Sequence, residues 1–235
     1  MTYTVGSLFS GIGGLDLGLE RAGMKVVWQS EIDPFACKVL KKHWPEVVNH
    51  GDIKQIDWGT VEPVDIICGG YPCQPFSTAG KRRGTNDPRH LWPWVRTAIS
   101  ELRPQYAILE NVRGHLTMGG LQVVGELAEI GYDAEWRVIS AAGVGAPHRR
   151  ERVIILAYPN SSRWEGSVRT QETNSAFGRF NDSGTIERWR EQWIAEPRMD
   201  RVAHGIPKRM DKLRGLGNAV VPQVAEYIGR LITTL

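Results

Sequence analysis

The 235-residue sequence has no long apolar run and a net charge of only +3. No segment approaches the roughly 18 apolar residues of a membrane-spanning helix, and residues 1–10 have neither the basic start nor the apolar stretch of a secretory signal. We therefore expect a cytoplasmic protein with no membrane contact. The length excludes a large second domain, since domains usually run to about 100 to 200 residues.

Cysteines are few, and their number is odd. Cys37, Cys68 and Cys73 form no C-x-x-C pair and have no matching histidine pattern. Neither a disulfide framework nor a zinc site is favoured, so no metal is expected and any cysteine chemistry is that of a free thiol. Cys68 lies within an apolar stretch, where a small buried hydrophobe is the simpler interpretation.

Lysine is also scarce, because 21 of the 29 basic residues are arginines. The planar guanidinium binds phosphates and guanine edges in a bidentate way. Basic residues cluster at 81–96 and at 149–152. A solvated surface would explain either cluster alone, and the small net charge does not by itself indicate a nucleic-acid partner.

Short apolar segments alternate with helical patterns over the first two thirds of the chain. Strands are expected at 3–9, 25–30, 47–48, 64–68, 106–109, 135–139 and 152–157, and helices at about 15–22, 34–40, 91–102, 119–130 and 221–231. This alternation predicts an α/β fold with a mostly parallel sheet covered on both faces.

The alternation stops near residue 158, which suggests three parts. Residues 1–158 would form the main domain, the polar segment 159–198 a small lobe, and residues 199–235 a C-terminal segment that returns to the main domain.

A glycine-rich turn follows the first expected strand, and an acidic residue ends the second. The turn is Gly11-Ile12-Gly13-Gly14, and Glu31 lies 18 residues beyond Gly13. Glycines let the backbone approach a ligand, and a carboxylate at about this spacing accepts hydrogen bonds from ribose hydroxyls. The pattern predicts an adenosine ligand, but glycines that only close a tight turn would give the same local sequence.

Asp16 stands where the third glycine of a dinucleotide-binding turn would fall. A pyrophosphate would meet Asp16 and Glu20, whereas a nucleoside with a positive charge is compatible with carboxylates. The sequence therefore favours S-adenosylmethionine over a dinucleotide. Asp52, after the third strand, is a second candidate for contact with the adenosine.

Cys73 follows the fourth expected strand, at the end where open α/β sheets bind their ligands. Pro72 and Pro75 restrict the backbone on both sides, which suits a thiol held in a fixed position. The arginines of 149–152 are candidates for the cation that an activated thiol needs. Glu110, at the end of the next strand, either caps the following segment or takes part in the chemistry.

Six short motifs follow one another along the chain. They are Ser7-Leu8-Phe9-Ser10-Gly11-Ile12-Gly13-Gly14, Gly51-Asp52-Ile53, Pro72-Cys73-Gln74, Glu110-Asn111-Val112, Arg150-Glu151-Arg152 and Gly217-Asn218-Ala219-Val220. This is the order found in DNA cytosine-5 methyltransferases, and the chain resembles that family, in its compact bacterial or phage form, over about 3–158 and 201–231. The resemblance implies a Rossmann-like sheet of the S-adenosylmethionine-dependent type, with 159–198 as a small irregular target-recognition insert.

The resemblance also implies roles for individual residues. Cys73 would add to C6 of cytosine, Glu110 would support the addition at N3, Arg152 would help to hold the base, and Arg150 would brace the site. The cofactor residues would be Phe9, Gly11, Gly13, Glu31, Asp52, Pro72, Leu91, Asn218 and Val220.

The implied substrate is double-stranded DNA, from which the target base must be flipped. The loop 77–89 would close over the base, with its basic residues on phosphates. Two features depart from the family. His148 replaces a frequent glutamine, and between 160 and 196 there are five arginines and no lysine against six acidic residues, so sequence recognition is expected to be short.

Three alternatives remain at this point. A tRNA cytosine methyltransferase would use the same chemistry on another substrate. A DNA-binding relic without activity would have lost some of Cys73, Glu110 or Arg152, and all three are present. A nicotinamide-dependent enzyme would need a pyrophosphate site that the glycine turn does not offer.

Overall fold

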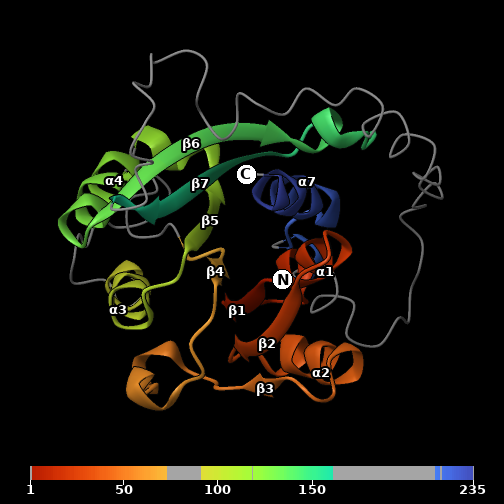
Figure 1. Ribbon diagram of the computed structural model, residues 1–235. Coiled ribbons are helices and arrows are strands. Elements are labelled where there is room, and N and C mark those ends of the chain that lie inside the picture. The colour runs from red at the N-terminus through yellow and green to blue at the C-terminus, as the bar shows by residue number, and fades with distance from the viewer. Residues whose placement is uncertain (1, 73–90, 118, 161–214, 218, 235) are drawn as a thin grey trace, which may run out of the picture.

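A seven-stranded sheet forms the centre of the protein (Figure 1). The computed structural model describes residues 2–72, 91–117, 119–160, 215–217 and 219–234. The strands are β1 (Thr4–Leu8), β2 (Lys25–Ser30), β3 (Val48–Asn49), β4 (Ile66–Gly69), β5 (Tyr106–Val112), β6 (Tyr132–Ser140) and β7 (Glu151–Pro159). The α-helices are α1 (Gly14–Arg21), α2 (Pro34–His43), α3 (Trp92–Leu102), α4 (Gly120–Glu129) and α7 (Pro222–Thr233).

The strands are ordered β3-β2-β1-β4-β5-β7-β6 across the sheet. Four neighbouring pairs are parallel, whereas β7 runs antiparallel to both β5 and β6. The α/β class and the mostly parallel sheet are thus confirmed. The strand order reverses between β1 and β4, and at such a switch point the carboxyl ends of the strands leave a crevice for a ligand.

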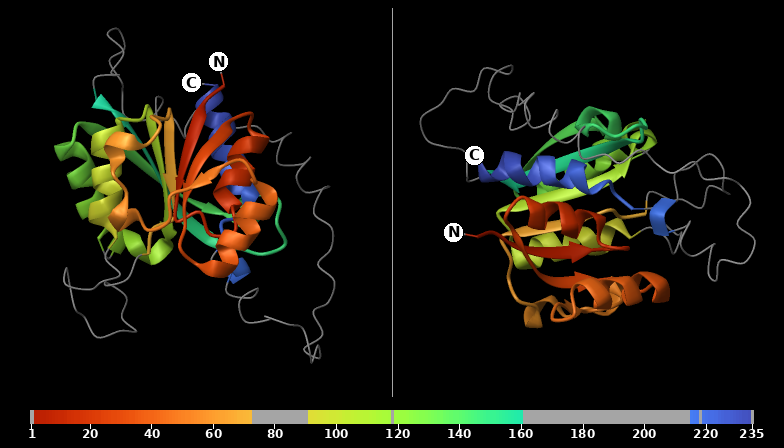
Figure 2. Two further views of the ribbon diagram at one scale, coloured as in Figure 1. Left: turned by 90° about the horizontal axis from the view of Figure 1, so that it is seen from below. Right: turned by 90° about the vertical axis from the view of Figure 1, so that its right-hand side faces the viewer.

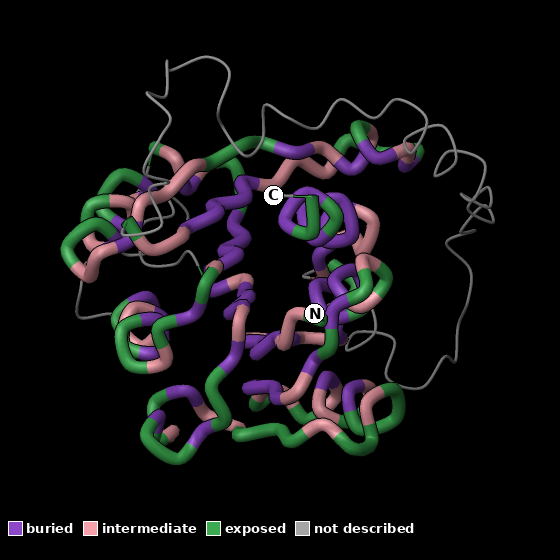
Figure 3. Tube along the Cα trace, viewed as in Figure 1, coloured by how far each residue is buried: buried purple, intermediate pink, exposed green. Residues whose placement is uncertain are grey.

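Helices cover both faces of the sheet (Figure 2). On one face α1 and α7 enclose an apolar cluster with Val5, Ile66 and Ile108 from the strands. On the other face α3 and α4 pack with the short 3-10 helix η2 (Trp58–Thr60) over a second cluster. Figure 3 shows buried positions along the central strands and exposed ones on the outer sides of the helices.

Glycines bring α1 and α7 into close contact. A β-carbon built on Gly18 would lie 2.2 Å from the carbonyl oxygen of Pro222 and 2.4 Å from Cβ of Ala225. A β-carbon on Gly229 would lie 2.5 Å from that of Ala22. Because no larger side chain fits at these positions, the two helix backbones approach closely and seal one face of the sheet.

Two further properties concern the described part of the chain. None of its helices is long and apolar enough to cross a membrane. None of its histidine, cysteine, aspartate and glutamate side chains gather into a group that would hold a metal ion.

Candidate active site

The candidate site lies along the carboxyl edge of β1, β2, β4 and β5, where the chain leaves each strand. The glycine turn follows β1, Glu31 follows β2, and the segment Gly70-Tyr71-Pro72 follows β4. Glu110 lies near the end of β5, where it pairs with Ile154 of β7. Parallel pairing places all four at one edge.

The turn after β1 adopts an unusual backbone. Phe9, Gly11 and Gly13 have φ of 51°, 56° and 84°, which is the left-handed region that favours glycine. The amide of Gly13 donates to the carbonyl of Ser10 over 2.9 Å. A β-carbon on Gly11 would meet only the carbonyl oxygen of Phe9, at 3.9 Å. Among the described residues, the turn therefore leaves space beside Gly11, whereas a β-carbon on Gly13 would lie 2.4 Å from the ring of Trp44.

Glu31 is held beside this turn by backbone amides. Its Oε2 accepts from the amide of Gly11 over 2.7 Å, and its Oε1 accepts from the amides of Ile32 and Asp33, each over 2.8 Å. These three bonds fix the carboxylate at the mouth of the turn. One acceptor position on Oε2 remains for a ligand hydroxyl.

Asp16 does not face a ligand, which corrects the sequence-based interpretation. It is fully buried beneath the turn, where Oδ2 accepts from Ser7 Oγ over 2.9 Å and Oδ1 from Gln29 Nε2 over 2.7 Å. Burial raises its pKa from 3.8 to about 6, although both hydrogen bonds oppose the shift. The case against a pyrophosphate therefore rests on Glu31 rather than on Asp16.

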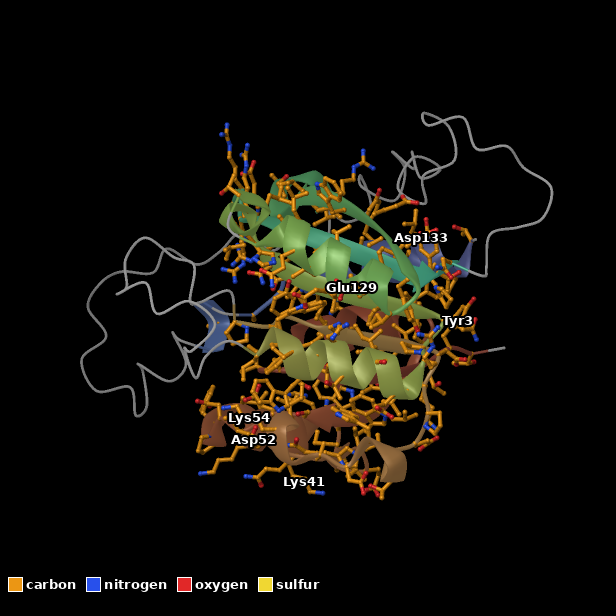
Figure 4. All side chains as sticks on the ribbon, turned by 90° about the vertical axis from the view of Figure 1, so that its left-hand side faces the viewer. Tyr3, Lys41, Asp52, Lys54, Glu129 and Asp133 are labelled. Carbon is orange, nitrogen blue, oxygen red and sulfur yellow. The ribbon has the colours of Figure 1, made fainter. Side chains whose placement is uncertain are left out.

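The remaining adenosine candidates line the same edge. Ser30 Oγ donates to the carbonyl of Gly51 over 2.7 Å, which places Asp52 next to the end of β2. Asp52 in turn accepts from the amide of Lys54 over 3.0 Å, and both residues are labelled in Figure 4. Leu91 immediately precedes α3.

Val220, a C-terminal candidate, lies against the start of α1. Val220 is buried, and its backbone oxygen lies only 2.4 Å from a β-carbon built on Gly14, so the strand-helix turn and the chain before α7 are in contact. Glu31 and Asp52 make this edge acidic. That set of groups fits S-adenosylmethionine, which combines ribose hydroxyls with a positive charge.

Glu110 and Arg152 form an ion pair at the end of β5. Arg152 Nε lies 2.7 Å from Glu110 Oε1, and the glutamate side chain is 10% exposed. Burial raises the pKa of Glu110, while the nearby guanidinium groups of Arg152 and Arg150 oppose that shift. A carboxyl group with these neighbours is suited to hold or share a proton with a ring nitrogen.

Arg150 binds backbone rather than another side chain of the site. Its Nη2 donates to the carbonyl oxygens of Gly217 and Ala219, over 2.7 and 2.6 Å. Its Nε is buried without a partner among the described residues, and its φ of 25° is strained. Arg150 therefore ties the beginning of β7 to the segment before α7, across about 70 residues of chain.

The segment before Cys73 packs directly on Glu110. A β-carbon on Gly70 would lie 2.8 Å from Glu110 Oε2, so the backbone of this residue touches the carboxylate. Asn111 Nδ2 donates to the carbonyl oxygen of Tyr71 over 3.1 Å. Pro72 follows and is exposed. The residues just before Cys73 therefore lie against the Glu110 carboxylate.

Two candidates from the sequence, Cys73 and Asn218, lie outside the described residues, as do the loop 77–89 and most of 159–198. Cys68 is fully buried, as expected. Sequence reasoning missed Tyr71, Asn111 and His115 as neighbours of the site. The signal was an aromatic residue directly before Pro-Cys, which is uninformative until its distant partner is known.

Similarity to known structures agrees with this geometry. A crystal structure of a DNMT2 variant from Spodoptera frugiperda matches with a TM-score of 0.61 and 27% identity, over 73% of this chain and 54% of that one. A putative DNA modification methyltransferase of an Escherichia coli prophage matches with a TM-score of 0.58 and 29% identity, over 68% and 47%. The fold is that of a Rossmann-like methyltransferase.

Sequence comparison then defines the family. Residues 3–200 match the model of the C-5 cytosine-specific DNA methylase family, and the chain belongs to that family. It is 43% identical to the Type II methyltransferase M.Eco47II of Escherichia coli over 166 residues, and 36% identical to M.NgoMIV of Neisseria gonorrhoeae over 173 residues. These alignments cover 67% and 70% of the chain, which spans 40% and 55% of the relatives' own lengths.

Proposed function

We propose that the protein transfers a methyl group from S-adenosylmethionine to C5 of a cytosine flipped out of double-stranded DNA, through a covalent bond between Cys73 and C6. The observation that carries this proposal is the buried Glu110–Arg152 ion pair, against which the chain packs just before Cys73. Membership of the C-5 cytosine-specific DNA methylase family and similarity to bacterial Type II methyltransferases support the choice of reaction.

Cytosine C5 is a weak nucleophile, and the proposed residues act on the ring to change this. The Cys73 thiolate forms a bond to C6, and the displaced electron pair reaches C5 while Glu110 shares its proton with N3. Burial raises the pKa of Glu110, which favours the protonated form that this step needs. Arg152, through its short contact with Glu110, fixes the orientation of the carboxyl group.

The cofactor supplies an electrophilic methyl group on a sulfonium. Glu31 would bind its ribose and Asp52 the adenosine. The other residues of the cofactor site would be Phe9, Gly11, Gly13, Pro72, Leu91, Asn218 and Val220. After transfer, C5 loses its proton to solvent and the Cys73–C6 bond breaks, which regenerates the thiolate and an aromatic 5-methylcytosine.

Covalent trapping tests the assignment of the nucleophile. A random-sequence DNA duplex with 5-fluorocytosine in place of cytosine, incubated with S-adenosylmethionine, should form a stable adduct with the wild-type chain, because fluorine at C5 cannot leave as a proton. Cys73→Ser should form none, while its affinity for the cofactor remains within about twofold of wild type. Gel electrophoresis under denaturing conditions measures the adduct, and calorimetric titration measures the affinity.

Cys68→Ser is the matched control, because this second thiol is buried in the sheet and should act only on stability. Failure of the wild type to form an adduct, or an adduct with Cys73→Ser, contradicts the proposal. An adduct with tRNA that contains 5-fluorocytosine, and none with the DNA, would indicate the same chemistry on an RNA substrate. Bisulfite sequencing of DNA from cells that express the protein gives the methylated positions.

A further inference from the structure

The chain is held at two points just before Cys73. Tyr71 is 4% exposed, and its backbone carbonyl accepts the hydrogen bond from Asn111. At the other end of the side chain, the Tyr71 hydroxyl lies 2.7 Å from Nε2 of His115, a residue 44 positions further along the chain. A backbone bond and a side-chain bond therefore act on the same residue.

His115 lies in surroundings that disfavour the charged imidazolium. It is 3% exposed, and burial lowers its pKa. Its Nδ1 is buried and has no hydrogen-bond partner in the described part of the protein. A doubly protonated ring would bury an N–H at Nδ1 without an acceptor among these residues, which opposes protonation. The contact with Tyr71 is the one hydrogen bond of the His115 side chain among the described residues.

The pair lies in a rigid frame of rings. The Tyr71 ring packs on Trp92 with centroids 5.4 Å apart, and edge-on against His115 with centroids 5.5 Å apart. Trp92 is fixed by a hydrogen bond of 2.6 Å from its Nε1 to Glu126 of α4. A β-carbon on Gly120 would lie 3.1 Å from the carbonyl oxygen of His115, so α4 begins tightly against that residue. The frame joins β4, α3, the segment after β5 and α4.

We propose that Tyr71 and His115 are positioning residues, whose mutual hydrogen bond sets the placement of the segment Gly70-Tyr71-Pro72, and with it Cys73, relative to Glu110. The role of the thiol in this inference rests on the proposed function. The geometry of the pair does not. Because Gly70 touches Glu110 and Asn111 binds Tyr71, a shift of the Tyr71 ring is transmitted to both sides of the site.

A displacement of about 1 Å between reacting groups can lower a rate by up to a hundredfold. Loss of the hydrogen bond between Tyr71 and His115 should therefore lower the rate of the reaction more than the stability of the fold. Loss of a buried tyrosine hydroxyl far from the site should lower the stability and leave the rate unchanged. Tyr132 offers that comparison, since it is fully buried and its hydroxyl donates to the carbonyl of Pro104 over 2.7 Å.

The experiment compares Tyr71→Phe, His115→Leu, the double variant and the control Tyr132→Phe, all in the full chain. Two rates are measured for each. One is the single-turnover rate of adduct formation with 5-fluorocytosine DNA and S-adenosylmethionine. The other is the rate at which iodoacetamide alkylates Cys73 without DNA, followed by mass spectrometry of the Cys73 peptide. Melting temperature is recorded alongside.

Both single variants should lower the adduct rate about fivefold, consistent with loss of one neutral hydrogen bond. Both should also change the alkylation rate by at least about threefold, and the two variants should change it in the same direction. The double variant should be no worse than the poorer single one, because both remove the same bond. His115→Gln, which retains a polar group to meet the Tyr71 hydroxyl, should recover at least half of the lost rate. Tyr132→Phe should lower the melting temperature and leave both rates unchanged.

Wild-type rates in Tyr71→Phe and His115→Leu, or equal losses in Tyr132→Phe, would overturn the inference and leave the pair a purely structural one. If the wild type forms no adduct, the proposed function fails. The alkylation rates still decide whether the pair positions the thiol.

Discussion

At the scale of single residues, the site depends on carboxylates whose surroundings give them different tasks. Glu31 is fixed by three amides at the mouth of the glycine turn, Glu110 is paired with Arg152, and Asp16 is buried below the turn. We propose that the first accepts ligand hydroxyls and that the second holds a proton. The third contributes to the stability of the turn through its hydrogen bonds to Ser7 and Gln29.

Glu31→Ala should weaken the binding of S-adenosylmethionine. The ribose hydroxyls would lose a charged acceptor worth roughly 1.5 to 3 kcal/mol, so the dissociation constant should rise about ten- to a hundredfold. Calorimetric titration measures this, with Glu129→Ala as the control, because Glu129 is exposed on α4 and pairs only with Arg96 in the described structure. An unchanged affinity would move the ribose contact to another residue.

Asp16 should make stability depend on pH in the direction opposite to most carboxylates. Its pKa of about 6 in the folded chain lies above the value of 3.8 in the unfolded chain, so the folded state holds the proton more tightly. The stabilising effect of that proton is complete below pH 3.8 and is lost as pH rises through about 6. Relative to Asp16→Asn, the wild type should lose roughly 3 kcal/mol between these limits.

Urea unfolding of wild type and Asp16→Asn at pH 4 and pH 7.5 measures this difference. The asparagine keeps an acceptor for Gln29 and can donate to Ser7. A free-energy difference that is the same at both pH values would show that burial does not perturb this carboxyl group.

At the scale of elements, the contact between α1 and α7 depends on small residues. Gly18→Ala places a methyl group within 2.2 Å of a backbone oxygen of α7, and backbone cannot move aside cheaply. We expect a loss of about 1 to 3 kcal/mol in the free energy of unfolding. Gly125→Ala is the matched control, because it lies in α4 with nothing within 4 Å of the added carbon. It should gain up to about 1 kcal/mol from helix propensity.

Chemical denaturation of both variants decides the matter. If Gly18→Ala proves as stable as wild type, then α7 has room to shift and the close approach is not required. A loss in both variants would indicate a general intolerance of substitution rather than a local clash.

The elements themselves were predictable from the sequence, because buried parallel strands appear as short apolar runs and helices as periodic ones. All seven strands and the five helices were found close to their expected ranges. β6 begins at Tyr132 instead of 135, because residues 132–134 pair with the end of β7. Apolar periodicity along one segment does not show which distant strand it pairs with.

The site was only partly predictable. Glu31 and the glycine turn were placed correctly relative to one another, because both follow strands that pair directly. Asp16 was misjudged, since spacing from a glycine does not say which side of a helix faces the ligand. Tyr71 and His115 were missed, because a contact across 44 residues follows from the packing of several elements and from no local pattern.

At the scale of the whole molecule, the proposed function requires residues that recognise a DNA sequence. The segment 159–198 is short, and residues 161–198 lie outside the described structure. Its arginines at 163, 169, 179, 188 and 190 are the best-equipped residues for base contacts, because each can bind N7 and O6 of guanine together.

Alanine at one of these five positions should cost about 1 to 3 kcal/mol and relax one position of the methylated motif. Alanine at Arg82 or Arg83 should weaken binding to all sequences and lower its salt dependence. Methylation mapping by sequencing separates the two behaviours. If none of the five substitutions alters the motif, the segment is structural and recognition comes from elsewhere.

The contact between α1 and α7 also has a consequence for the order in which the two faces of the sheet are covered during synthesis. About 200 residues separate the two helices, and ribosomes add roughly 5 to 20 residues per second. The apolar face beside β1 therefore stays uncovered for at least about ten seconds of synthesis, whereas α3 and α4 emerge soon after their strands. The half of the protein that carries the glycine turn is therefore completed last, since Gly14 gains its contact with Val220 only after the segment before α7 has been made.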